Sequence, residues 1–255
     1  MSKKLYIDFM EEDELDRVKE NHNLLVFSYL TLRNLIGFSG ILLPFVLIGT
    51  TVIGEDEYRI APSISDYYYT NNGDVVVVVL CVLGVFLLTY KGYTRSERIL
   101  TSIAAVSAIG VAFSPTSASS VSAASIHVTN ETIPYFFGVQ LHLIFAALFL
   151  TSLALIALVY FPRSRHPVIP VNSQKYKRNR IYRISGWLMV GSLLLIVAYF
   201  VLNPEWLKGV PVVFILEAVA VEAFGLAWIT KGETLWPDGE HYIQRAYRAW
   251  LSRVT

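Results

Sequence analysis

Several long apolar segments, separated by polar loops, dominate this sequence. Because a helix rises about 1.5 Å per residue, roughly 20 apolar residues cross the ~30 Å hydrocarbon core of a bilayer. A soluble domain rarely contains several such segments, and here 54% of the 255 residues are hydrophobic. The sequence therefore predicts an all-α fold, a polytopic membrane bundle of six transmembrane helices at residues 35–53, 74–90, 99–113, 134–161, 184–202 and 211–229.

The two ends of the chain differ in pattern from its apolar centre. Residues 1–34 are acidic and then basic, which is typical of a solvated cytoplasmic helix. Near the C-terminus, apolar residues recur at helical spacing and arginines take the other face; the apolar set is Ile243, Ala246, Tyr247, Trp250, Leu251 and Val254. We expect a lead-in over 1–34, a six-helix transmembrane domain over 35–229 and an amphipathic interfacial tail over 230–255.

Lysine and arginine are distributed unevenly among the loops between the apolar segments. The loops after the second and fourth segments hold three and seven of them, whereas the other three connecting loops hold only Arg59 and Lys208. Loops rich in basic residues remain in the cytoplasm. We therefore expect an integral protein of the cell (plasma or inner) membrane with both termini in the cytoplasm.

Charge and cysteine content exclude other classes of protein. A net charge of +1 argues against nucleic-acid binding by bulk electrostatics. The single cysteine, Cys81, excludes a disulfide framework and a cysteine-rich metal site. The motifs of a nucleophile elbow, a phosphate-binding loop and a dinucleotide-binding fold are missing. The partners to expect are membrane lipids.

Two glutamates, Glu217 and Glu222, lie inside the last apolar segment. A carboxylate in hydrocarbon is costly, so such residues usually face the protein interior and often mark a functional site. Five residues apart, they point in directions that differ by about 140° and cannot share one narrow face. Glu222 lies deeper and is expected to make an interhelical contact, which leaves Glu217 as the first candidate for a functional role.

Several other polar residues are predicted to lie at about the same depth in the membrane as Glu217. Glu217 lies six residues inside Pro211, and His142 lies six residues beyond Phe136, near which the fourth span is expected to enter the membrane, so each is roughly 9 Å deep. Asp74 begins the second span at the same side, and Ser63 and Asp66 lie in the loop before it. Together these side chains are expected to line one outward-facing pocket.

Two kinds of chemistry are considered for such a pocket, and a third hypothesis needs no pocket. An apolar cavity with a few convergent polar groups binds a lipid or other amphiphile, and this hypothesis needs the fewest assumptions. A metal-dependent membrane hydrolase is the alternative, because imidazole and carboxylate ligands suit zinc; its ligands would come from His127, His142, Asp66, Asp74 and Glu217. A structural or regulatory membrane protein without a small-molecule site is a further possibility. Zinc is the one cofactor considered, and only for the hydrolase.

Four short segments carry a resemblance to known proteins. They are Ser-Ile-Ser-Asp-Tyr-Tyr at 63–68, Tyr-Lys-Gly-Tyr at 90–93, Arg-Asn-Arg-Ile-Tyr-Arg at 178–183, and Phe-Gly-Leu-Ala-Trp at 224–228 with Lys-Gly-Glu at 231–233. Over most of residues 30–235 the chain resembles an uncharacterised prokaryotic family of six-span membrane proteins. The Ser-Asp segment is also distantly similar to the damage-regulated autophagy modulator superfamily. Both resemblances imply six spans, and neither implies a catalytic residue.

The polar residues near the outer face are also similar in type to those of a family of membrane hydrolases. Hydrolases of the alkaline ceramidase type have seven spans and hold zinc with three histidines, an aspartate and a serine. This chain departs from that pattern, because it has six predicted spans and only His127 and His142 at or beyond the outer face.

Overall fold

A computed structural model describes residues 30–53, 60–70, 72–90, 92, 94–114, 116, 135–163, 173–232 and 235. The N-terminal lead-in up to residue 29, His127 and the amphipathic segment near the C-terminus lie outside the described residues. The expectations for these three parts of the chain therefore stay predictions.

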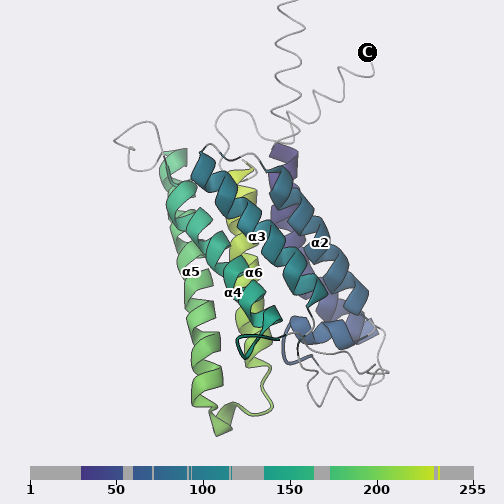
Figure 1. Cartoon of the computed structure of the whole chain (residues 1–255). Coiled ribbons are helices and arrows are strands. Elements are labelled where there is room, and N and C mark those ends of the chain that lie inside the picture. The colour runs from purple at the N-terminus through teal and green to yellow at the C-terminus, as the bar shows by residue number, and fades with distance from the viewer. Residues whose placement is uncertain are drawn as a thin grey trace, which may run out of the picture.

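Long helices packed side by side form the molecule (Figure 1). They are Leu30–Ile53, α2 (Gly73–Thr89), α3 (Arg95–Phe113), α4 (Leu141–Leu155), α5 (Gln174–Leu202) and α6 (Val212–Lys231). α4 continues as a π-helical turn, η2 (Ile156–Tyr160). Shorter elements lie between them: the 3₁₀ helices η1 (Ser65–Tyr69) and η3 (Glu205–Leu207), and a hairpin of β1 (Tyr135–Phe136) and β2 (Val139–Gln140).

The predicted all-α class is confirmed, and the composition of the helices supports an integral membrane protein. Five of the described helices are long and apolar enough to cross a membrane. α2 has 17 residues and is equally apolar, but at about 26 Å it lies at the lower limit for a span. Large apolar side chains such as Phe45, Val106 and Leu194 are exposed on the outside of the bundle, where lipid would solvate them.

α5 begins ten residues before its predicted start at Ile184. Ser173 caps the helix, because its side chain accepts a hydrogen bond from the backbone N–H of Tyr176. The basic residues from Lys175 to Arg183 therefore lie on a helix instead of in a loop. With 29 residues, α5 is about 44 Å long, so its basic first turns extend beyond a ~30 Å hydrocarbon core.

α4 begins later than its predicted start at Pro134. The hairpin Tyr135–Gln140 precedes it, and the two residues at its tip, Phe137 and Gly138, have φ of +49° and +78°. These left-handed conformations form a tight reversal that a helix cannot contain. His142 is consequently the second residue of α4 and does not lie several residues deep as the predicted span required.

Small residues allow the closest helix contacts. Gly37 of the first helix faces Gly225 of α6: a Cβ added at Gly225 would lie 2.6 Å from the carbonyl oxygen of Gly37. α3 lies between α2 and α4 (Figure 1), and its small residues, Ala104, Ala105 and Ala108, are fully buried. α3 therefore packs its small residues between two neighbouring helices, while its opposite face, with Ile99 and Val106, stays exposed.

Aromatic and charged side chains fill one end of the bundle, which we call the basic end. There the ring of Trp228 contacts those of Tyr90 and Phe161 at centroid distances of 4.9 and 5.3 Å. The hydroxyl of Tyr90 donates to Oε1 of the buried Glu97 at 3.0 Å. These contacts join α2, α3, α4 and α6. The opposite end, where η1 lies, is called the η1 end.

The contact between Gly37 and Gly225 can be tested by adding one methyl group. Gly225→Ala forces the first helix away from α6, and overpacking of this kind costs about 1–3 kcal/mol. Gly191→Ala in α5 is the matched control, since no atom lies within 4 Å of its added Cβ. We expect a lower melting temperature in detergent for Gly225→Ala only. Equal melting temperatures for the two variants would contradict this packing.

Candidate functional site

The segment that organises the η1 end is the η1 loop, residues 60–70, between the first helix and α2. Two hydrogen bonds within it explain its shape. Ser63 Oγ donates to Asp66 Oδ2 at 2.8 Å, and the backbone N–H of Asp66 donates to Ser63 Oγ at 3.0 Å. Such a serine–aspartate exchange closes a short turn at the start of a helix. It fixes η1, and Asp66 is buried as a result.

On one side the η1 loop is bonded to the beginning of α6. The backbone N–H of Ile64 donates to Oε2 of Glu217 at 2.6 Å. In the other direction, the backbone N–H of Phe214 donates to the carbonyl oxygen of Pro62 at 2.9 Å, which satisfies one of the free N–H groups in the first turn of α6. The rings of Tyr67 and Phe214 pack together, 5.8 Å between centroids. Glu217 therefore holds a loop backbone in place.

On the other side the η1 loop is bonded to α4 through His142. Ser65 Oγ and His142 Nε2 lie 2.8 Å apart, and His142 Nδ1 lies 2.7 Å from the backbone carbonyl oxygen of Ser114. Because a carbonyl oxygen only accepts, Nδ1 carries a proton. In the neutral ring, Nε2 is then free to accept the hydroxyl proton of Ser65. The chain Ser65–His142–Ser114 thus has a defined direction.

A small cavity lies beside this hydrogen-bonded chain. Ser65, Tyr68 and His142 form its polar wall, and residues of α2 and α3 such as Val76, Leu80, Val111 and Ala112 form its apolar walls. Its volume of about 10 Å³ has room for roughly one water molecule. With η1 in this position, the site is closed to anything larger.

The candidate residues divide into those of this cluster and those outside it. Ser63, Asp66, His142 and Glu217 meet around the η1 loop, from parts of the chain that are up to 154 positions apart. Asp74, in the first turn of α2, is exposed, and its carboxylate makes no hydrogen bond with the described residues. Ser65 was not among the candidate residues, although it lies between two of them; only its contact with His142 identifies it.

Glu222 has a different environment from Glu217. It lies more than one turn further along α6, and its Oε1 is buried without a hydrogen-bond partner among the described residues. The two glutamates therefore differ in their hydrogen bonds: Glu217 accepts one from the η1 loop, and Oε1 of Glu222 accepts none from the described residues. The expected interhelical hydrogen bond from Glu222 is not seen in the described part of the chain.

Metal ligands do not gather at the η1 end as far as the structure describes it. Residues 30–53, 60–70, 72–90, 94–114, 135–163 and 173–232 contain no group of three or more His, Cys, Asp or Glu side chains placed to hold a metal ion. Ser65 and the carbonyl of Ser114 take up both nitrogens of His142. His127, the other histidine of the zinc hypothesis, lies outside the described residues.

Comparison with known proteins adds no relative: no protein-family model, no curated protein and no solved structure matches this chain. The geometry of its own residues therefore has to support any functional conclusion.

The different environments of the two glutamates predict opposite responses to the same substitution. Glu217→Leu leaves the N–H of Ile64 without its acceptor, a loss of about 1–3 kcal/mol, so the melting temperature should fall. Glu222→Leu removes a buried oxygen without a partner from an apolar helix, so the melting temperature should stay the same or rise. Thermal unfolding in detergent measures both. A larger loss for Glu222→Leu would contradict the assignment of Glu217 as the loop-holding residue.

Proposed function

We propose that the protein is a six-span integral membrane protein that binds the polar group of a lipid or other amphiphile at the η1 end. α2 supplies the sixth span together with the five longer helices. The basic end faces the cytoplasm, because the connections between α2 and α3 and between α4 and α5, with the helix starts that follow them, hold ten lysines and arginines, whereas the other three connections hold only Arg59 and Lys208. The η1 loop then lies at the outer surface, at the depth of lipid headgroups.

One observation supports this function best: the cavity beside η1 combines polar and apolar walls. Its polar wall holds Ser65 and His142, and its other walls are the apolar faces of α2 and α3. Amphiphile sites have this composition, a mainly apolar cavity with a few polar groups that fix orientation. Glu217 and His142 bind η1 in this structure. A ligand headgroup would replace the loop as their hydrogen-bond partner when η1 moves outward.

Lipid retention tests this function. Wild-type protein purified in mild detergent should carry a co-purified amphiphile that native mass spectrometry detects by its added mass. His142→Ala and Glu217→Gln should reduce its occupancy severalfold, because each removes a polar partner of the headgroup. Asp74→Asn is the matched control, since Asp74 is exposed at the same end of the bundle. If both cluster variants keep the same amphiphile and the same thermal stability as wild type, the site has no such role.

A second function, acyl transfer or hydrolysis, is favoured by the direction of the Ser65–His142–Ser114 chain. In such a reaction, Ser65 Oγ attacks the carbonyl carbon of an ester while His142 Nε2 takes its proton. His142 then returns the proton to the leaving alkoxide, and a water molecule hydrolyses the acyl-serine by the same route. The Ser114 carbonyl would hold the imidazole in the required tautomer. Unlike the zinc alternative, this chemistry needs no metal ligand.

Labelling with a fluorophosphonate probe tests the second function, because the probe reacts with serines activated by a base. Wild-type protein in native membranes should be labelled, and Ser65→Ala and His142→Ala should abolish the label. Ser102→Ala should keep it, because Ser102 lies in α3 and does not line the cavity beside His142. An unlabelled wild type, or a label that persists in Ser65→Ala, rules out Ser65 as the nucleophile.

A further inference from the structure

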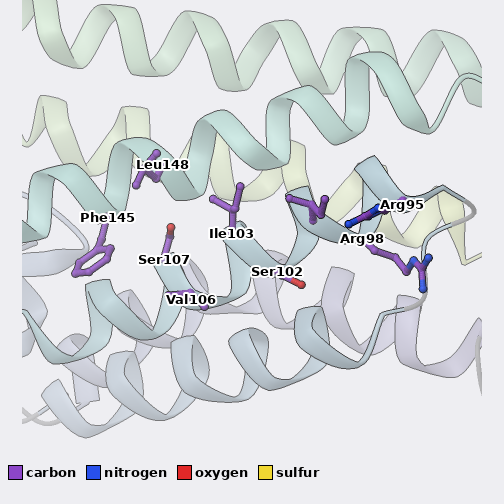
Figure 2. A pocket seen from close by; sticks show the side chains of 9 residues that line it. Arg95, Arg98, Ser102, Ile103, Val106, Ser107, Phe145 and Leu148 are labelled. Atoms are coloured by element: carbon purple, nitrogen blue, oxygen red, sulfur yellow. The ribbon is translucent and has the colours of Figure 1, made fainter.

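A groove of about 630 Å³ lies between α3 and α4 and runs from the basic end toward the start of α4. Arg95 and Arg98, in the first turn of α3, lie at one end of the groove, and Phe145 of α4 lies at the other (Figure 2). Between them the walls are mainly apolar, with Ile103 and Leu148 among the lining side chains. No residue of this groove belongs to the cluster around η1.

The groove opens toward the surrounding lipid. The side chains of Ile99, Ile103 and Val106 are 53%, 40% and 56% exposed, although they belong to an apolar helix. From Arg95 to Val106 the helix rises about 16 Å, close to the ~15 Å depth of one hydrocarbon leaflet. The length and the exposure of this surface match the acyl chain of a lipid from the leaflet at the basic end.

The positive charge at one end of the groove favours a lipid with a negatively charged headgroup. Arg95 and Arg98 are exposed, and neither guanidinium group makes an ion pair or hydrogen bond within the described part of the chain. The nearest carboxylate in sequence, Glu97, does not neutralise them, because it is buried and bonded to Tyr90. The first turn of α3 adds positive potential of its own. Two guanidinium groups at the membrane surface suit the phosphate of an anionic lipid.

We propose that this groove binds one anionic phospholipid, with an acyl chain along α3 and α4 and the phosphate at Arg95 and Arg98. The spacing of the lining residues explains why they face the same groove. Arg95, Arg98, Ser102 and Val106 recur every three or four positions, so their side chains share one face of α3. The site requires only that the bundle lies in a membrane. It is independent of any ligand at the η1 end.

Native mass spectrometry of the full chain with added phosphatidylglycerol or phosphatidylcholine of the same acyl chains tests the proposal. Wild type should bind one phosphatidylglycerol in preference to phosphatidylcholine. Arg95→Gln with Arg98→Gln should weaken phosphatidylglycerol binding by about 10- to 30-fold and abolish the preference. Arg180→Gln with Arg183→Gln is the matched control, because these arginines are equally exposed near the basic end but do not line the groove.

A variant that fills the groove separates binding inside it from attraction to the basic surface. Val106 is more than half exposed, so Val106→Trp occupies the groove without disturbing the core. It should weaken the binding of phosphatidylglycerol while both arginines remain. Equal binding of the two lipids by wild type, equal losses in the two double-arginine variants, or unchanged binding in Val106→Trp would each overturn the proposal. His142→Ala should leave this lipid in place, which distinguishes it from an amphiphile at the η1 end.

Discussion

The attachment of the η1 loop to α4 and α6 is the contact on which the η1 end of this bundle depends. Non-helical backbone near a membrane needs partners for its N–H and C=O groups, because lipid supplies none. The loop finds them in Glu217, in the first turn of α6 and within its own serine–aspartate turn. Ser65 adds a contact with His142 on the opposite side. A polar segment is thus held between two apolar helices.

The two ends of the molecule use polar side chains in opposite ways. At the η1 end, Ser63, Ser65, His142 and Glu217 form hydrogen bonds within the protein and leave space for about one water molecule. Near the basic end, Arg95 and Arg98 face an open groove. The first arrangement suits a site that opens only when a loop moves. The second suits a ligand that arrives from the surrounding membrane.

The sequence was sufficient to predict the helices, because an apolar run of spanning length has few other ways to fold. It also drew attention to His142 and Glu217, because polar residues in apolar segments are costly. Both contact the η1 loop, although His142 does not lie at the depth predicted for it. The predicted start of α4 was wrong, because the two residues that reverse the chain, Phe137 and Gly138, are not a proline or an Asn-Gly pair that would mark a turn in the sequence. The basic segment before Ile184 was assigned to a loop because positive charge was interpreted only as a sign of topology, although those residues also form helix.

Contacts between segments far apart in the chain were beyond prediction from one sequence. Nothing in the order of residues shows that the N–H of Ile64 meets Glu217, or that Ser65 rather than its neighbour Ser63 faces His142. Asp74 was selected because it begins a span, yet the first turn of α2 leaves it exposed. The groove at Arg95 and Arg98 was detectable in principle from the spacing along α3. Its depth depends on how α4 packs, which only the structure provides.

Hydrogen–deuterium exchange of the protein in lipid nanodiscs tests the central claim, that the η1 loop is bonded into the bundle. The N–H groups of Ile64, Asp66, Tyr67 and Thr70 all donate hydrogen bonds. Peptides covering residues 60–70 should therefore exchange slowly in wild type and much faster in Glu217→Leu, while peptides from α3 stay protected. Exchange of residues 60–70 in wild type at the rate of unprotected amides would contradict the claim.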